Sequence, residues 1–152
     1  HADNPKVAMN LRDGFPHPYG LADAEAFLSM VEEQNPRTYF AIATATEAIG
    51  GIGYSVGKDV YRFAAEIGYW LAEPYWNRDI ATEAVTLFVD WVFRNEEINR
   101  LHAGVYGNNH ASMRVLEKAG FEREGIHRAK VVKNGKILDE VVYARVRPEL
   151  AR

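Results

Sequence analysis

The sequence predicts an α+β fold in which a mostly antiparallel sheet is flanked by helices. Apolar residues recur with helical spacing in some segments, and β-rich runs separate those segments. The last two β-rich runs are joined by Asn134-Gly135, the pair that tight type I′ hairpins prefer. Because helices and strands are mixed and paired runs stand near both ends of the chain, we expect hairpins around one mostly antiparallel sheet.

The first half of the chain is predicted to hold one helix and three strands. Residues 1–20 are rich in turn formers, and the opening HADNPKV reads like the tail of a helix. A helix is predicted over 21–34, where Asn35-Pro36 ends it. Strands are predicted over 39–45, 49–56 and 63–71. The third strand carries a single charge, Glu66.

The second half begins with a polar connection and a long helix. Apolar residues cover most of the circumference of the helix predicted over 80–94, so we expect it to be largely buried. A strand over 100–106 is followed by a short helix that ends at Gly120. The final strands are predicted over 121–133 and 136–147. No repeat or linker interrupts the pattern, so we expect a single domain over residues 1–152.

Length and residue usage limit the class of protein. The 152 residues suit one domain, and 26% charged and 12% aromatic residues are typical of an ordinary globular protein. The absence of cysteine excludes disulfides, thiolate zinc sites, iron–sulfur clusters and a cysteine nucleophile, and it favours a cytoplasmic location. No apolar run approaches the ~18–20 residues of a membrane helix, and no secretory leader is visible.

The distribution of charge favours a small anionic ligand over nucleic acid. Residues 1–77 carry 5 Lys and Arg against 10 Asp and Glu, whereas residues 78–152 carry 13 against 11. The second half could therefore receive an anion, but a net charge of −3 does not favour nucleic acid. The five histidines show no metal-ligand spacing, so no metal is predicted.

Two segments could carry chemistry. After the strand over 63–71, the turn into the next helix exposes unpaired N–H groups, which favour a bound anion such as a diphosphate. The turn could also be a plain connection, because Asn77 and Asp79 stand where glycines would let a backbone approach phosphate. Further on, Asn109 and Ser112 place an amide and a hydroxyl where a strand ends, although they could also be a helix cap and a first-turn hydroxyl.

Short motifs in a fixed order carry a family resemblance that covers nearly the whole chain. They are Asp3-Asn4-Pro5, Asn10-Leu11-Arg12-Asp13, Phe15-Pro16-His17-Pro18-Tyr19, Gly51-Ile52-Gly53, Ala65-Glu66-Ile67-Gly68-Tyr69-Trp70-Leu71, Ile80-Ala81-Thr82-Glu83-Ala84 and the run from Asn108 to Phe121. Together they resemble the GNAT superfamily of acetyl-CoA-dependent N-acetyltransferases. The resemblance is greatest to its RimJ/RimL-like branch, which acts on the N-terminal amines of ribosomal proteins.

The resemblance implies a GNAT-like fold, in which a twisted central sheet splays midway and holds acetyl-CoA in the cleft. Main-chain groups of the strand ending at Leu71 and Ala72 would pair with the pantetheine arm. Asn109 would contact that arm, and Ser112 would lie near the thioester sulfur. The turn that would hold the diphosphate consists of Asn77, Arg78, Asp79, Ile80, Ala81 and Thr82. The amine pocket would be lined by Arg12, Phe15, His17 and Tyr19.

Two features depart from the family pattern. The diphosphate turn usually has glycine at the position of Asp79, whose carboxylate is expected to cap the helix and take the N–H groups that a diphosphate would use. One extra negative charge about 4 Å from a phosphate costs ~1 kcal/mol in water and ~4 kcal/mol at an effective dielectric constant of 20. Arg78 could offset part of this cost. The family's first strand is also missing, so we expect a truncated chain.

Direct transfer of an acetyl group to an amine agrees with a chain that lacks cysteine. The protein has to position a neutral amine, remove a proton, stabilise the oxyanion and assist the leaving thiolate. We predict Glu66 as the base, acting directly or through a water, and Ser112 as the group that assists the sulfur. A backbone N–H near Leu71 could serve the oxyanion. Alternatively, Glu66 could face solvent or pair with an arginine, and Ser112 could be a helix-turn hydroxyl only.

Two functions are therefore compatible with the sequence. The first is an N-acetyltransferase that acts on a primary amine of a small molecule or peptide, for example a protein N-terminus. The second is a catalytically inactive acyl-CoA-sensing or protein-interaction domain that retains the fold, an interpretation that Asp79 supports. No motif records the acceptor amine. Exposed strands near the end of the chain could support a homodimer.

Overall fold

The described part of the chain forms one sheet in which all neighbouring strands but one pair run antiparallel. The structure is a computed structural model that describes residues 1–150. Its strands are β1 (Tyr39–Ala43), β2 (Ala48–Val56), β3 (Ala64–Leu71), β4 (Arg100–Tyr106), β5 (Glu122–Lys133) and β6 (Lys136–Val146). They lie in the order β1-β2-β3-β4-β6-β5, and the parallel pair is β3 with β4. The predicted α+β class is confirmed.

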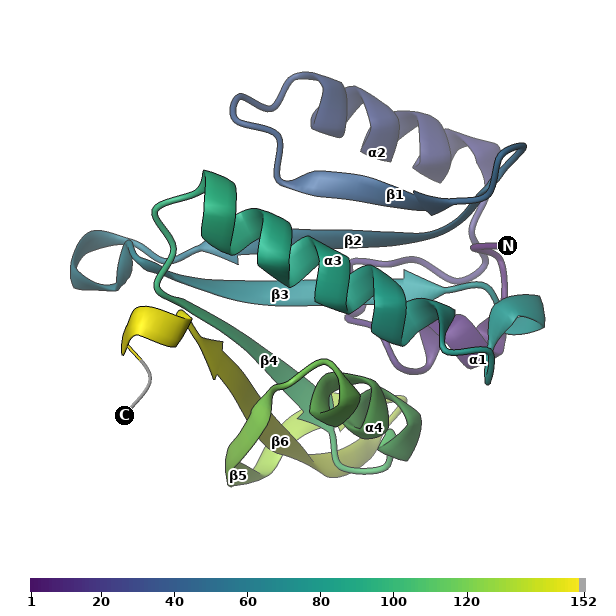
Figure 1. Cartoon of the computed structure of the whole chain (residues 1–152). Coiled ribbons are helices and arrows are strands. Elements are labelled where there is room, and N and C mark those ends of the chain that lie inside the picture. Colours follow the sequence, from purple (N-terminus) through teal and green to yellow (C-terminus); the bar gives the residue numbers. More distant parts are fainter. Residues whose placement is uncertain (151–152) are drawn as a thin grey trace.

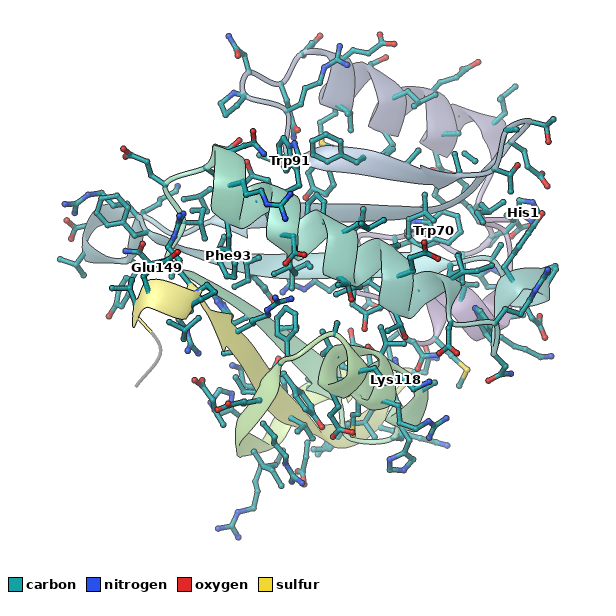
Figure 2. The ribbon with its side chains drawn as sticks, in the orientation of Figure 1. His1, Trp70, Trp91, Phe93, Lys118 and Glu149 are labelled. Carbon is teal, nitrogen blue, oxygen red and sulfur yellow. The ribbon has the colours of Figure 1, made fainter. Side chains whose placement is uncertain are left out.

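Helices α3 (Ile80–Asn95) and α4 (His110–Lys118) cover one face of the sheet, while α2 (Leu21–Glu32) lies along β1 (Figure 1). Val85, Val89 and Val92 of α3 are fully buried, because residues three and four apart share one face of a helix. The prediction that this helix is buried around most of its circumference is wrong, since Leu87 is 63% exposed. Trp91 (Figure 2) is 37% exposed. Its ring packs against Phe40 of β1, with ring centroids 5.1 Å apart.

The sheet opens between its two central strands. β3 pairs with β4 only from Ala64 opposite Arg100 to Glu66 opposite His102. Beyond this point β3 stays with β2 as far as Leu71, whereas β4 stays with β6 along its whole length. Each strand follows its antiparallel partner, so the two halves of the sheet diverge (Figure 1). The splayed sheet implied by the family resemblance is confirmed.

Short sequence motifs account for the turn between β5 and β6 and for the start of the first helix. Asn134 and Gly135 have φ angles of 50° and 73°, as both central residues of a type I′ turn require, so the predicted hairpin is confirmed. The opening residues were expected to form a helix tail, but they begin a helix, α1 (Pro5–Ala8). The side chain of Asn4 accepts a hydrogen bond from the Lys6 N–H and caps this helix. Pro5 suits the first helical position, because the N–H that proline lacks would have no partner within the helix. No helix within residues 1–150 is long and apolar enough to span a membrane.

Candidate active site

A cleft of about 1480 Å³ opens where β3 and β4 diverge. The predicted site residues that line it are Arg12, Phe15, Tyr19, Glu66, Leu71, Asn77, Arg78, Asp79, Ile80, Ala81, Thr82, Asn109 and Ser112. Ala72 and His17 are not among its lining residues. Ala72 is fully buried, and His17 lies beside Asp3, with 3.3 Å between His17 Nδ1 and Asp3 Oδ1. The structure therefore brings most of the predicted residues to one place.

The end of β3 presents unused backbone groups to this cleft. The Ala72 N–H donates to the Ile49 carbonyl at 2.8 Å, so Ala72 faces β2. Because backbone groups alternate along an antiparallel ladder, those of Tyr69 and Leu71 face the opposite edge, where β4 has already diverged. The Leu71 carbonyl accepts the Trp76 Nε1–H at 2.7 Å, which leaves the Leu71 N–H. An extended ligand that carries amides can pair here as an added strand would.

The turn before α3 leaves the first amides of the helix available. Asn77 and Asp79 have φ angles of 57° and 55°, a left-handed conformation that glycine adopts most easily and that Asn and Asp tolerate better than other residues. The first backbone bond of the helix runs from the Glu83 N–H to the Asp79 carbonyl at 2.9 Å. The amides of Ile80, Ala81 and Thr82 precede it, so they are free to bind an anion.

The carboxylate of Asp79 does not cap α3, so that expectation is wrong. A side chain that caps a helix normally extends from a backbone in the β region, whereas Asp79 is left-handed. Its carboxylate instead pairs with Lys118 at the end of α4, with 2.6 Å between Lys118 Nζ and Asp79 Oδ1 (Figure 2 labels Lys118). Arg78 lies 5.7 Å from the ring centroid of Tyr75 and also lines the cleft. Arg78 and Lys118 therefore place two positive charges beside the N-terminus of α3.

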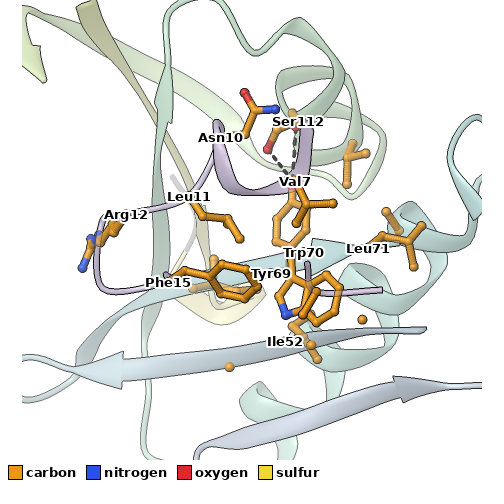
Figure 3. A pocket seen from close by; sticks show the side chains of 18 of the residues that line it. Val7, Asn10, Leu11, Arg12, Phe15, Ile52, Tyr69, Trp70, Leu71 and Ser112 are labelled. Atoms are coloured by element: carbon orange, nitrogen blue, oxygen red, sulfur yellow. Dashed lines mark hydrogen bonds between the residues drawn. The ribbon is translucent and has the colours of Figure 1, made fainter. Parts of the chain in front are cut away.

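The first turn of α4 places Ser112 at the cleft. Asn109 caps this helix, because its Oδ1 accepts the Ser112 N–H at 3.1 Å. The hydroxyl of Ser112 lies 2.8 Å from the hydroxyl of Tyr69 (Figure 3). Burial is the main reason that the pKa of Tyr69 rises to about 12, although a hydrogen bond from Ser112 to the ionised phenol opposes the shift. Sequence analysis did not single out Tyr69, although it is two residues before Leu71 and so shares its face of the strand.

Glu66 enters the cleft from the other face of β3. Its Oε1 forms an ion pair with Arg12, and this hydrogen bond is the main reason that the pKa of Arg12 is raised. Since successive side chains of a strand alternate between faces, Glu66 and Tyr69 lie on opposite faces of the sheet. A ligand in the opening can therefore meet Glu66 from one face and Ser112 from the other. The alternative in which Glu66 pairs with an arginine is confirmed, and both residues of the pair line the cleft.

The loop over residues 11–19 covers the Glu66 face. Phe15 packs against Trp70 of β3, with ring centroids 5.6 Å apart. Lys133 Nζ of β5 contacts Asp13 Oδ1 at 2.7 Å and fastens the loop beside Arg12. Lys133 is only 9% exposed. Within residues 1–150, Asp13 is the only hydrogen-bond partner of its ammonium. The contact joins positions 120 residues apart, and no local signal in the sequence predicts it.

Tyr106 and Glu140 also line the cleft and were not predicted. They are opposite each other in the β4–β6 register. Burial would raise the pKa of Glu140, but hydrogen bonds from His127 and Lys130 outweigh it and lower this pKa. The carboxylate is therefore available as an anion beside the opening. Within residues 1–150 no group of three or more His, Cys, Asp or Glu side chains could hold a metal ion.

Comparisons with known proteins agree with this geometry. A family model described as an acetyltransferase (GNAT) domain matches residues 1–122. YjcK, a probable N-acetyltransferase of Bacillus subtilis, is 39% identical over 120 residues, which are 77% of this chain and 66% of YjcK. YoaA, an uncharacterized N-acetyltransferase of the same organism, is 36% identical over 141 residues, or 86% of this chain and 79% of YoaA. The uS5-alanine N-acetyltransferase of Escherichia coli is 26% identical over 130 residues, 82% of this chain and 67% of the enzyme.

Solved structures show the same fold. The structure of RimL, a ribosomal L7/L12 α-N-protein acetyltransferase in complex with coenzyme A, superposes with a TM-score of 0.83 at 21% identity, over 95% of this chain and 82% of RimL. Mycobacterium smegmatis RimJ, in complex with CoA-disulfide, gives a TM-score of 0.75 at 26% identity, over 86% of this chain and 64% of RimJ. Fold and cleft thus define the class as an acetyl-CoA-dependent N-acetyltransferase domain. The chain belongs to the GNAT family of acetyltransferases, and its relatives include RimJ/RimL-like enzymes.

Proposed function

We propose that this protein transfers the acetyl group of acetyl-CoA directly to a primary amine, without a covalent enzyme intermediate. The observation that carries the proposal is the coincidence of two sets of backbone donors in one cleft, at the open edge of β3 and at the start of α3. The pantetheine arm of acetyl-CoA carries amides, and its diphosphate is an anion, so each set has a matching partner. The chain has no cysteine to carry an acetyl group.

The placement of the co-substrate follows from these donors. The pantetheine amides pair with the backbone of Tyr69, the Leu71 N–H is left for the thioester carbonyl, and the diphosphate accepts hydrogen bonds from the amides of Ile80, Ala81 and Thr82. Arg78 and Lys118 supply positive charge beside it. Ala72 contributes only indirectly, because its own N–H holds β3 against β2. Asn109 is proposed to act through its capping bond to Ser112, which fixes the first turn of α4.

The reaction needs one proton acceptor and two hydrogen-bond donors. Glu66 accepts the proton of the attacking amine, directly or through a water, at Oε2, since Arg12 occupies Oε1. The Leu71 N–H stabilises the oxyanion that forms on the thioester carbonyl. The Ser112 hydroxyl donates a hydrogen bond to the sulfur as the carbon–sulfur bond breaks. The products are the N-acetylated amine and the thiolate of coenzyme A, which takes a proton from solvent, while the proton held by Glu66 returns to solvent.

The acceptor is proposed to be a primary amine such as a peptide N-terminus. The loop that carries Arg12, Phe15 and Tyr19 lines the side of the cleft from which the amine would approach Glu66. His17, which points to Asp3, is proposed to support this loop and not to touch the amine. The similarity to a uS5-alanine N-acetyltransferase, whose name specifies an alanine of a ribosomal protein, supports a peptide acceptor.

The test combines calorimetry with CoA and a thiol-release assay with acetyl-CoA and a panel of amines. The panel comprises peptides with different first residues, amino acids and polyamines. Binding of CoA together with amine-dependent thiol release is expected. Binding without turnover of any amine would instead favour the acyl-CoA-sensing domain, and loss of both would contradict the assignment of the cleft to acetyl-CoA.

A further inference from the structure

The phenol of Tyr69 is a partly buried polar group that the proposed reaction does not use. Its ring packs against the hydrophobic core, and its hydroxyl reaches the first turn of α4. Tyr69 Oη lies 2.8 Å from Ser112 Oγ and 3.3 Å from the Ser112 carbonyl oxygen (Figure 3). Both residues line the cleft. The hydroxyl proposed to assist the sulfur is therefore in direct contact with a second hydroxyl.

We propose that Tyr69 is a positioning residue, which holds the Ser112 hydroxyl with its hydrogen directed at the leaving sulfur. The inference rests on the proposed function and adds to it a residue that acts through Ser112. Without a partner, a serine hydroxyl rotates among its staggered positions, and only some of them aim the hydrogen into the cleft. A hydrogen bond accepted by Ser112 Oγ restricts this rotation.

Counting hydrogens gives the direction of the bond. A phenol and a serine hydroxyl each carry one hydrogen. If Tyr69 donates to Ser112 Oγ, the Ser112 hydrogen is left for the sulfur. In the other arrangement Ser112 donates to Tyr69 and Tyr69 donates to the Ser112 carbonyl, so both hydrogens are used within the protein. Both arrangements use the 2.8 Å contact, but the second also needs a hydrogen bond to the carbonyl over 3.3 Å, which is long for an O–H···O bond, so the first arrangement is favoured.

Tyr69 acts as a donor of a hydrogen bond and keeps its proton. Burial raises its pKa to about 12, whereas an ordinary thiol ionises at a pKa of about 8.5. A departing thiolate is therefore too weak a base to take the proton of this phenol through Ser112. The Tyr69 O–H bond stays intact during the reaction, and no new charge forms on the ring. Its contribution is to orientation and to polarisation of the Ser112 hydroxyl.

Tyr143 provides a matched control for a purely structural role. Its Oη donates to Glu117 Oε1 at 2.8 Å, so Tyr143 ties β6 to α4 as Tyr69 ties β3 to α4. Tyr143 is 1% exposed and does not line the cleft. If Tyr69 served only to fasten α4, Tyr69→Phe and Tyr143→Phe would lower the melting temperature and change turnover to the same extent.

The first experiment measures kcat and KM for acetyl-CoA in Tyr69→Phe, Tyr143→Phe, Ser112→Ala and the double variant of Tyr69 and Ser112. We expect Tyr69→Phe to lower kcat about 3- to 10-fold, the effect of one lost hydrogen bond, with KM within twofold. Tyr143→Phe keeps kcat. Once Ser112 is replaced by alanine, Tyr69→Phe has no further effect. An unchanged kcat in Tyr69→Phe, or an equal loss with and without Ser112, would overturn the proposal.

A second experiment needs no acceptor amine. The thiol of bound CoA is titrated by its thiolate absorbance in the unsubstituted protein and in both tyrosine variants. We expect Tyr69→Phe to raise the pKa of this thiol by about 0.5 to 1 unit, and Tyr143→Phe to leave it unchanged. Identical titrations in the unsubstituted protein and in Tyr69→Phe would contradict the role of Tyr69. CoA binding with no turnover of any amine would contradict only the proposed transfer, because this titration still reports on Tyr69.

Discussion

Glu66, the proposed base, forms an ion pair with Arg12. The side chain of Arg12 is 76% exposed and that of Glu66 is 34% exposed, so the pair contributes little to stability. Arg12 contacts only Oε1, and within residues 1–150 no hydrogen bond reaches Oε2. A carboxylate held by one oxygen has a fixed position and keeps a free acceptor, which suits a general base better than a freely rotating side chain.

Replacement of Glu66, the proposed base, should therefore slow turnover without weakening CoA binding. We expect Glu66→Gln to lower kcat about 100-fold or more, because the amide cannot accept the amine proton. The CoA dissociation constant from calorimetry should stay within twofold. Glu124→Gln is the matched control, since Glu124 forms a similar ion pair with Arg100 and does not line the cleft. A kcat for Glu66→Gln equal to that of this control would remove Glu66 from the mechanism.

The expected effect of Asp79 on CoA binding depends on its ion pair with Lys118. Its carboxylate forms an ion pair with Lys118, a cation beside the proposed diphosphate site. We expect Asp79→Gly to tighten CoA binding roughly 3- to 10-fold, because it removes a negative charge, frees Lys118 and suits the left-handed backbone. Lys118→Gln should weaken binding, most clearly at low salt.

A control for the change of backbone is available in the same chain. Asp59 also has a φ of 55° and lies outside the cleft, so Asp59→Gly makes the same replacement without altering charge near the diphosphate. Calorimetry with CoA should detect no change in this variant. Unchanged or weaker affinity in Asp79→Gly would show that its carboxylate does not oppose the diphosphate.

Among the elements, α4 joins structure to chemistry through its first turn. The Asn109 side chain satisfies the Ser112 N–H and so fixes the residue whose hydroxyl is proposed to assist the sulfur. We expect Asn109→Ala to cost ~1 kcal/mol of stability, which lowers the melting temperature by about 2–4 °C in a domain of this size. Asn108→Ala is the control, because the Asn108 side chain makes no hydrogen bond within residues 1–150. Equal melting temperatures for the two variants would show that the cap is not needed.

The helices and strands could be predicted from the sequence better than the contacts between them. Apart from α1, which was not predicted, helix and strand boundaries were predicted to within two residues, because hydrophobic spacing and turn residues such as Gly120 act locally. The splay was predicted only through the family resemblance, since nothing in β3 or β4 alone shows where their pairing ends. The contacts of Tyr69 with Ser112 and of Asp79 with Lys118 join residues 43 and 39 positions apart, so they follow from the placement of α4.

Buried phenols make the stability of the protein depend on alkaline pH. The folded chain holds the pKa of Tyr69 near 12, mainly through burial, while the unfolded chain titrates near 10. Below pH 10 both states are protonated and the contribution is fully present. Between pH 10 and 12 the unfolded state binds fewer protons, so the free energy of unfolding falls by about 2–3 kcal/mol through this group.

Urea unfolding at pH 9, 10 and 11 tests this dependence. The decrease in stability over that range should be smaller in Tyr69→Phe than in the unsubstituted protein. Tyr61→Phe is the control, since Tyr61 is 71% exposed and its removal should leave the pH dependence unchanged. A decrease of the same size in all three proteins would show that other groups dominate alkaline unfolding.

The divergence of β3 from β4 has a consequence for isotope exchange. Along β3, the amides of Gly68 and Trp70 are bonded to β2, while those of Tyr69 and Leu71 face the gap. In deuterated water the strand should therefore show alternating protection, with slow sites next to fast ones in the interior of a folded sheet. A molecule that pairs with the gap would slow the fast sites and leave their neighbours as they were, so this pattern can record occupancy one amide at a time.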